Sequence, residues 1–381
     1  MTMAPRSEKV VLLHTVISPY KVTLFNQLSH WFPNLHVMYY SVTEKMRSWT
    51  VDRGDLTHHY SLLNEGNLED HSWIWIAIQV WRELDRLNPD LLIVSEYIYL
   101  PYWSGLIWAV VHRKKRLFFS ESTEADRPRP WWKEIVKRWF VRRFDAGISQ
   151  GSQSKAYMAV LGMPEDRITV KGYSTDNHFY ARGAATARAN RVELSTQWGV
   201  SEVNILFVGR FAPEKNLMAL IVAYEQLVNR HPNLGLVMVG DGPLQDEFRN
   251  ELAMRHLDRA VVIPFLQKQD VPTIYGLADV FVLPSISEPW GLVVNEAMAA
   301  GLPVVVSSKA GSAHDLVRHG LNGYVVDPMN VGEIVDAIDR LVSDTDLRRR
   351  MGAAAIVSVA DFTSEKSAER MAVAMAGCID L

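Results

Sequence analysis

The stretch that decides the fold is VFVLPSISEPWGLVVNEAMAAGLPVVV, which spans residues 280–306. It begins and ends with apolar runs that have the length of buried strands. Between them lie a proline-rich loop that carries Glu288 and a glycine, Gly291, that precedes a helical pattern with Glu296. The order strand, loop, helix and strand predicts a unit of a parallel, doubly wound α/β sheet. The loop then lies at the carboxyl edge of the sheet, where such folds bind anionic and polyhydroxylated ligands.

Composition bounds the class of protein. A chain of 381 residues suits two domains, and 48% hydrophobic with 22% charged residues is typical of a globular protein. The formal net charge of −3 argues against nucleic acid as a partner. Cys378 is the only cysteine, which excludes internal disulfides and fits a reducing compartment. The polar start of the chain does not resemble a signal peptide, and the apolar run 98–111 is too short to span a bilayer. We therefore expect a cytoplasmic protein.

Short apolar runs alternate with helical patterns in both halves of the chain, which predicts two doubly wound domains. Residues 180–190 are rich in Ala, Arg, Gly and Thr and read as a linker between them. The first predicted domain spans residues 1–181 and the second spans 182–361. The final segment, residues 362–381, is amphipathic and is expected to pack back onto the first domain. Residues 41–70 are polar and irregular, and we expect a long loop there rather than a metal site.

A second cluster of polar residues follows the predicted strand 205–208. Gly209 permits close backbone approach, and Arg210 and Lys215 bring two fixed positive charges to the start of the next helix. Such a place suits a diphosphate, because Arg can bind two oxygens at once and Lys acts as a point charge. An ordinary helix start with solvated charges is the alternative reading of this pattern.

The two glutamates of the first stretch have several readings. Glu288 and Glu296 could act as a general acid and base, or they could be a surface carboxylate and a capping carboxylate. Because Glu296 lies inside a helix, a division of roles is favoured, with Glu288 at a reacting sugar and Glu296 at a ribose. The backbone amides of residues 291–293, at the helix start, can meet a phosphate or hydroxyl oxygen.

Taken together, residues 203–328 resemble the donor domain of family 4 glycosyltransferases, which are retaining enzymes with the GT-B fold. The resemblance rests on motifs in the family's order. They are Gly209-Arg210 with Lys215, Gly240-Asp241-Gly242-Pro243, Tyr275 with Ala278-Asp279, the E-x7-E pair Glu288 and Glu296, the run from Ala297 to Val304, and Gly320-Leu321-Asn322-Gly323.

The resemblance implies a fold and a function. The fold would be α/β, GT-B, with two Rossmann-like domains facing a central cleft and a C-terminal helix that returns to the first domain. The enzyme would move a sugar, as a hexosyltransferase does, from a UDP- or GDP-sugar to a glycan, lipid-linked or small-molecule acceptor, in polysaccharide or glycoconjugate biosynthesis. The first domain would bind the acceptor. The alternatives are a catalytically silent nucleotide-sugar binding protein and another GT-B enzyme, such as a nucleotide-sugar epimerase.

The resemblance also assigns roles to residues. The catalytic residues would be Arg210, Lys215 and Glu288, and the donor-binding residues would be Gly209, Gly291, Leu292, Val293 and Glu296. Fixed cations at the leaving diphosphate can replace a metal ion, so neither a metal nor a cofactor is expected. The single D-x-D sequence, Asp344-Thr345-Asp346, joins two late helices and is read as a helix cap.

The first domain carries fewer signals. Family members often have a histidine after an early strand, but residues 118–124 contain none. Glu121, Ser122 and Glu124 are the candidates for that place, with no side chain there as the alternative, and His14, at the end of the first strand, is a further candidate. Tyr20 lies in a first turn that lacks the family's glycines, and we include it as a candidate acceptor residue.

The segment Arg127–Phe144 is basic and contains three tryptophans. Such a helix suits an anionic membrane surface on the inner face or a lipid-linked acceptor. The slightly favoured alternative is an amphipathic helix that buries its tryptophans in the first domain and leaves its charges in water.

Overall fold

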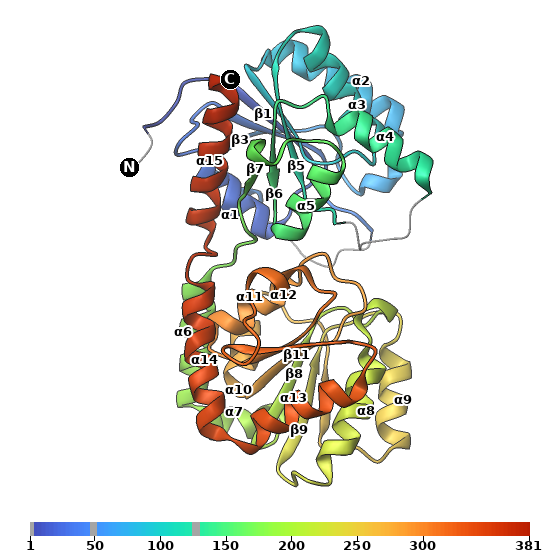
Figure 1. The fold of residues 1–381 in the computed structure, drawn as a ribbon, viewed down its shortest axis with the longest axis vertical. Helices are drawn as coiled ribbons and strands as arrows, with labels where there is room; N and C mark the ends of the chain where they lie inside the picture. Colours follow the sequence, from blue (N-terminus) through green and yellow to red (C-terminus); the bar gives the residue numbers. More distant parts are fainter. Residues whose placement is uncertain (1–3, 46–51, 124–129) are drawn as a thin grey trace. The chain divides into compact units, whose positions relative to one another are not determined.

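A computed structural model of the protein describes residues 4–45, 52–123 and 130–381. Its contacts divide the chain into two compact units (Figure 1). Unit 1 comprises Met1–Tyr173 and Ser364–Leu381, and unit 2 comprises Ser174–Thr363. The units thus divide after residues 173 and 363, whereas the boundaries predicted from the sequence fall after residues 181 and 361.

Unit 1 is built on a seven-stranded sheet with the order β3-β2-β1-β4-β5-β6-β7. All neighbouring strands are parallel, and Leu12 of β1 is paired with Val37 on one side and Ile93 on the other. Central parallel strands are buried on both faces, which explains their continuous apolar runs. The strands are β1 (Val10–Val16), β2 (Leu35–Ser41), β3 (His59–Leu62), β4 (Leu91–Val94), β5 (Lys115–Ser120), β6 (Ala146–Ser149) and β7 (Ile168–Val170).

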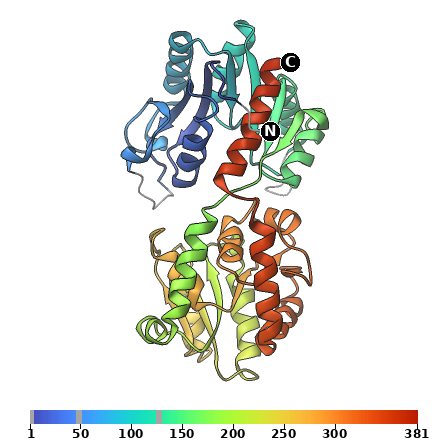
Figure 2. The same cartoon turned by 90° about the vertical axis from the view of Figure 1, so that its left-hand side faces the viewer.

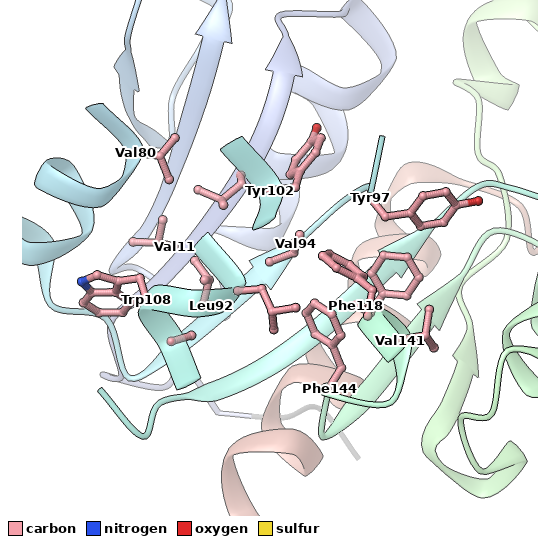
Figure 3. Close-up of a cluster of buried hydrophobic side chains, with 14 of the residues drawn as sticks. Val11, Val80, Leu92, Val94, Tyr97, Tyr102, Trp108, Phe118, Val141 and Phe144 are labelled. Atoms are coloured by element: carbon pink, nitrogen blue, oxygen red, sulfur yellow. The ribbon is translucent and has the colours of Figure 1, made fainter. Parts of the chain in front are cut away.

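Four helices pack on one face of this sheet. They are α2 (Trp73–Leu87), α3 (Leu100–Val111), α4 (Trp131–Val141) and α5 (Ser152–Val160). In α2 the residues Ile76, Val80 and Leu84 recur at helical spacing and are fully buried. Figure 3 shows the cluster beneath these helices, in which Leu92 and Phe118 of the sheet meet side chains of the helices. This cluster holds the helices against the sheet.

Two helices cover the other face. They are α1 (Pro19–Leu28) and α15 (Ser364–Asp380), and they lie beside one another (Figure 2). Met371 and Met375 of α15 are fully buried in the same cluster as Phe25 of α1. The C-terminal helix therefore completes the core of unit 1, as the sequence predicted.

Unit 2 is built on a six-stranded parallel sheet with the order β10-β9-β8-β11-β12-β13. Its strands are β8 (Val203–Val208), β9 (Leu234–Val239), β10 (Ala260–Ile263), β11 (Val280–Leu283), β12 (Val304–Ser307) and β13 (Gly323–Val326). Its helices are α6 (Asn177–Ala189), α7 (Arg191–Trp198), α8 (Leu217–Val228), α9 (Gln245–Met254), α10 (Val271–Leu277), α11 (Leu292–Ala299), α12 (Gly311–Asp315), α13 (Val331–Ser343) and α14 (Thr345–Val359).

Three local predictions were wrong, each for a physical reason. Residues 180–190 are not a linker but lie in α6, whose small residues let it pack closely on α10. A Cβ added at Gly183 would lie 2.5 Å from Pro272 of α10. The polar segment 41–70 contains the edge strand β3, which pairs only with β2 and therefore needs little apolar character. The tryptophans of α4 are exposed, because Phe140 and Val141 on its opposite side already fill the core.

Within the residues that the structure describes, no helix combines the length and the apolar character needed to cross a membrane.

Candidate functional site

Two predicted catalytic residues of unit 2 form an ion pair. Lys215 ends the short 3-10 turn Pro213–Lys215 after β8, and Glu288 lies in the loop after β11. The Lys215 ammonium donates to Oε2 of Glu288, and the side chains are only 17% and 12% exposed. The two strands are neighbours in the sheet, so their carboxyl ends bring these residues together. Sequence reasoning named both residues but not their contact.

An asparagine that sequence reasoning missed fastens this pair of loops. Asn216, next to Lys215, has a left-handed backbone (φ 55°). Its side-chain amide donates to the carbonyl oxygens of Pro284 at 3.2 Å and Pro328 at 2.8 Å. The backbone amide of Ile286 also donates to the carbonyl of Glu214 at 2.9 Å. The cation and the carboxylate are therefore held by loops that are bonded to one another.

The start of α11 lies directly after Glu288. Gly291 precedes the helix with φ 87°, and an added Cβ would lie 2.7 Å from Leu283 and 3.2 Å from Cγ of Glu288. The backbone amide of Gly311 donates to the carbonyl of Glu288 at 3.0 Å, which ties the loop to α12. The first backbone amides of a helix have no hydrogen-bond partner within the helix. In α11 these are the amides of residues 292 and 293, which lie beside the Glu288 loop. This arrangement suits an anionic ligand.

Arg210 provides a second cation at the same sheet edge. It follows β8 by two residues, is exposed, and makes no ion pair with a described residue. The neighbouring loop after β9 approaches closely, because a Cβ added at Gly240 would lie 2.0 Å from the carbonyl oxygen of Gly209. The backbone amide of Phe211 donates to the carbonyl of Asp241 at 2.6 Å. Both predicted glycine turns therefore belong to one interlocked pair of loops.

Glu296 sits in a different environment from Glu288. The hydroxyl of Tyr275 in α10 donates to its Oε2 at 2.9 Å. Burial raises the pKa of Glu296 to about 7, although hydrogen bonds from Tyr275 and Tyr180 oppose the shift. Glu288 faces a lysine while Glu296 faces two tyrosines, so the two glutamates lie in different environments.

A second charged cluster lies at the carboxyl edge of the unit 1 sheet. Glu121 follows β5 and accepts hydrogen bonds from Lys21, from Gln150 after β6, and from the Tyr173 hydroxyl at 2.7 Å. Lys171, which follows β7, is buried beside it. Burial disfavours the charge of Glu121, but Lys21 outweighs it and the pKa of the carboxyl falls to about 2. Burial also lowers the pKa of the Lys171 amine well below its ordinary value.

The other candidates of the first domain differ from this cluster. Both ring nitrogens of His14 are buried without a hydrogen-bond partner in the described chain, and the ring packs edge-on against Phe25. Burial lowers the pKa of His14 to about 3, so the imidazole is neutral. Glu124 lies outside the described residues, as does the side chain of Tyr20. Glu121 is thus the described candidate with charged partners.

The D-x-D sequence has the structural role that was predicted for it. The Asp344 carboxylate accepts a hydrogen bond from the amide of Leu347 at 2.8 Å and caps α14. Asp346 pairs with Arg349 one turn later.

Comparison with solved structures establishes the fold class. The chain superposes on a crystal structure of Anabaena HepE in complex with UDP and glucose, with a TM-score of 0.76 and 19% identity, covering 97% of this chain and 99% of that one. Sucrose-phosphate synthase from Thermosynechococcus elongatus gives a TM-score of 0.73 at 19% identity, covering 96% and 97% of the two chains. Two doubly wound units of this kind define the GT-B fold.

The sequence comparisons concern mainly unit 2. Residues 195–357 match the model of the family described as glycosyl transferases group 1. The chain is similar to an uncharacterized glycosyltransferase of Methanocaldococcus jannaschii (40% identity over 39% of this chain and 37% of the relative) and to α-D-kanosaminyltransferase of Streptomyces kanamyceticus (32% over 50% and 48%). It is also similar to D-inositol 3-phosphate glycosyltransferase of Nocardia farcinica (28% over 78% and 64%). The matches therefore span between about a third and two thirds of these relatives' lengths.

Proposed function

We propose that the protein is a retaining glycosyltransferase of the family 4 type, which moves a hexose from a UDP- or GDP-sugar to a glycan, lipid-linked or small-molecule acceptor in the cytoplasm. Unit 2 would bind the donor and unit 1 the acceptor. The observation that carries the proposal is the Lys215–Glu288 pair beside the start of α11. The group 1 family match over residues 195–357 and the structural likeness to HepE in complex with UDP and glucose support it.

The pair explains how donor binding and leaving-group departure would be coupled. A diphosphate at the α11 amides would compete with Glu288 for the Lys215 ammonium, and Arg210 would supply the second cation. Glu288, released from Lys215, would accept hydrogen bonds from the sugar hydroxyls. Departure of the nucleoside diphosphate develops negative charge, which fixed cations and amide dipoles stabilise. We propose that this arrangement needs neither a metal ion nor a cofactor, and that Glu296 binds the ribose.

Neither His14 nor Glu121, the two candidates of unit 1 whose side chains the structure describes, is suited to act as a general base. His14 is neutral with a strongly lowered pKa, and the Glu121 carboxylate is engaged by Lys21 and Tyr173. Two rival functions are open to test, and the first is a nucleotide-sugar binding protein without transferase activity. An epimerase with the same fold would act on the donor without an acceptor.

The test is release of nucleotide from UDP- and GDP-sugars with and without candidate acceptors, in buffer with EDTA. We expect acceptor-dependent release that EDTA leaves unchanged. The Lys215→Ala and Glu288→Ala variants should each lower turnover by about 10²- to 10³-fold, as loss of a charge-stabilising group does. Arg349→Ala, which removes a cation from an exposed ion pair in α14, is the matched control and should retain wild-type turnover.

Measuring UDP binding distinguishes the proposed role of Glu288 from that of Lys215. Because Glu288 competes with a diphosphate for Lys215, Glu288→Gln should bind UDP alone about threefold to tenfold more tightly, a change of about 1 kcal/mol, whereas Lys215→Ala should bind it more weakly. Weaker UDP binding by Glu288→Gln would contradict the competition. UDP binding with no change in any donor would favour the silent binding protein, and conversion of a donor to its epimer without an acceptor would favour the epimerase.

A further inference from the structure

We propose that the outer surface of helices α2, α3 and α4 in unit 1 binds the surface of an anionic lipid bilayer. These helices cover one face of the sheet and are neighbours in the fold (Figure 1). Their inner sides form the core described above, so their outer sides are not needed for it. The inference stands on the charge and exposure of this surface and does not depend on the proposed transferase activity.

Helix α4 presents an apolar stripe to solvent. Trp131, Trp132 and Trp139 are 75%, 53% and 48% exposed, and Ile135 and Val136 between them are exposed as well. These positions recur at i, i+1, i+4, i+5 and i+8, the spacing of one helix face. Helix α4 thus has a second apolar face in addition to the buried one. Exposed apolar patches of this kind mark interaction sites.

The rings are held in place by neighbours in unit 1. Trp139 stacks on Trp103 of α3, with ring centroids 6.0 Å apart and an angle of 10° between the planes. The Arg143 guanidinium lies 4.6 Å from the Trp139 ring centre, and the Lys133 ammonium lies 5.4 Å from that of Trp132. Tryptophan beside a cation is the pairing found where proteins meet a membrane interface.

The apolar surface continues beyond α4. Ile107, Val110 and Val111 of α3 are exposed on the side that carries Trp103, and Ile74 and Trp75 are exposed at the start of α2. The hydroxyl of Ser104 donates to the Ala77 carbonyl at 2.8 Å, which fixes α3 against α2. Helix α3 therefore packs on α2 and, through Trp103, on Trp139 of α4.

The charge of this surface selects an anionic partner. Residues 130–145 contain five Lys or Arg residues and two carboxylates, whereas the whole chain has a formal net charge of −3. Glu134 is bonded to Lys137, and Asp145 to Arg116. The remaining cations of α4 and its C-terminal end, Lys133, Arg138, Arg142 and Arg143, form no ion pair with any residue that the structure describes. Basic residues beside an apolar stripe are what an anionic bilayer surface attracts.

A second copy of the chain fits this surface less well. A twofold interface brings the same patch of both copies together. The cations Lys133, Arg138, Arg142 and Arg143 of one copy would then face the same cations of the other copy. A bilayer with anionic headgroups instead neutralises these cations while the tryptophans enter the interface.

The experiment is flotation of the full chain with vesicles of phosphatidylglycerol and phosphatidylcholine, compared with vesicles of phosphatidylcholine alone. We expect binding to the anionic vesicles that weakens as salt increases, and little binding to the neutral ones. The double variant Trp131→Ser with Trp132→Ser should lower binding at least tenfold at every salt concentration. Lys133→Glu with Arg138→Glu should abolish the preference for anionic lipid.

Matched controls lie in unit 2. Val192→Ser with Met329→Ser removes two exposed apolar side chains, and Arg349→Glu with Arg350→Glu makes the same charge change on α14. Both should bind within twofold of wild type. Because all substituted residues are exposed, circular dichroism and thermal unfolding should be unchanged. Absence of wild-type binding to anionic vesicles at low salt would overturn the proposal. Vesicle binding by the tryptophan variant at the wild-type level would also overturn it. A third contrary result would be a wild-type protein that binds no vesicles but forms a dimer, with the tryptophan variant monomeric.

Discussion

Glu296 is a partly buried carboxylate whose raised pKa makes unit 2 sensitive to pH. Its pKa is raised to about 7, against an ordinary value of 4.5. Below pH 4.5 the group is protonated in the folded and unfolded states, so it costs nothing. Between pH 4.5 and about 7 the unfolded chain releases the proton while the folded chain retains it, so stability falls as pH rises. Above pH 7 the full cost, about 3 kcal/mol, is present.

We therefore expect Glu296→Gln, which resembles the protonated form, to be more stable than wild type at pH 8 and about equal to it at pH 4.5. Urea unfolding of both proteins at the two pH values measures the difference. Glu247→Gln, which neutralises an exposed carboxylate of α9, is the control and should show no such change. A wild-type advantage at pH 8 would mean that the Glu296 carboxylate is stabilised in the fold rather than destabilised.

Residue types at the ends of predicted strands were enough to name Lys215, Glu288 and Glu296, but not their partners. The Lys215–Glu288 pair joins residues 73 positions apart, and the Lys21–Glu121 pair joins residues 100 positions apart. No local pattern determines which loops meet at a sheet edge, because that depends on strand order. Lys21 was therefore not named as a site residue, although it lies in the first turn of α1 (Pro19–Leu28), the helix that follows the first strand.

At the scale of elements, the loops after β8 and β9 are packed together through contact between their backbones rather than between side chains. A Cβ at Gly240 would lie 2.0 Å from the carbonyl oxygen of Gly209, and the φ of 143° at Gly240 is rare for other residues. We expect Gly240→Ala to push the Arg210 loop away, weaken UDP binding and destabilise unit 2 by about 1–3 kcal/mol.

Gly377→Ala is the matched control for this prediction. Gly377 is exposed in helix α15 with nothing within 4 Å of an added Cβ. The change should stabilise the protein by about 0.5–1 kcal/mol, because alanine favours the helix. Thermal unfolding and UDP titration measure both variants. If Gly240→Ala bound UDP as wild type does, close contact of the two loops would not matter for the site.

Helices and strands whose sequence fits a single hydrophobic pattern were predictable. Those whose sequence fits two readings were not. The apolar runs 91–94, 146–149 and 260–263 predict strands and the periodicity of residues 73–87 predicts a helix, and these are the bounds of β4, β6, β10 and α2. Helix α6 was taken for a linker because its alanines and glycines serve close packing on α10, which composition cannot distinguish from flexibility. Helix α4 has apolar residues on both sides, and only the position of the core shows which of them face solvent.

At the scale of the whole molecule, helix α15 packs into the core of unit 1. Ser367 of α15 donates to the carbonyl oxygens of Lys171 and Gly172, and Ala368, Met371 and Met375 are buried against the sheet. Unit 2 is therefore inserted between two parts of unit 1 in the sequence. Residues of β1 and β5 share one buried cluster with α15, so the core of unit 1 is complete only with this helix in place.

Because α15 packs only into the core of unit 1 among the described residues, a substitution in this helix should destabilise unit 1 and not unit 2. Met375→Ala removes a fully buried side chain and should cost about 2–5 kcal/mol. Hydrogen exchange measured by mass spectrometry should then increase in peptides of β1, β5 and α1 and stay unchanged in peptides of β8 to β13. Val373→Ala, at a position 57% exposed on the same helix, should alter neither set. Faster exchange in unit 2 under Met375→Ala would show that α15 stabilises both units, contrary to the division of the core seen in the structure.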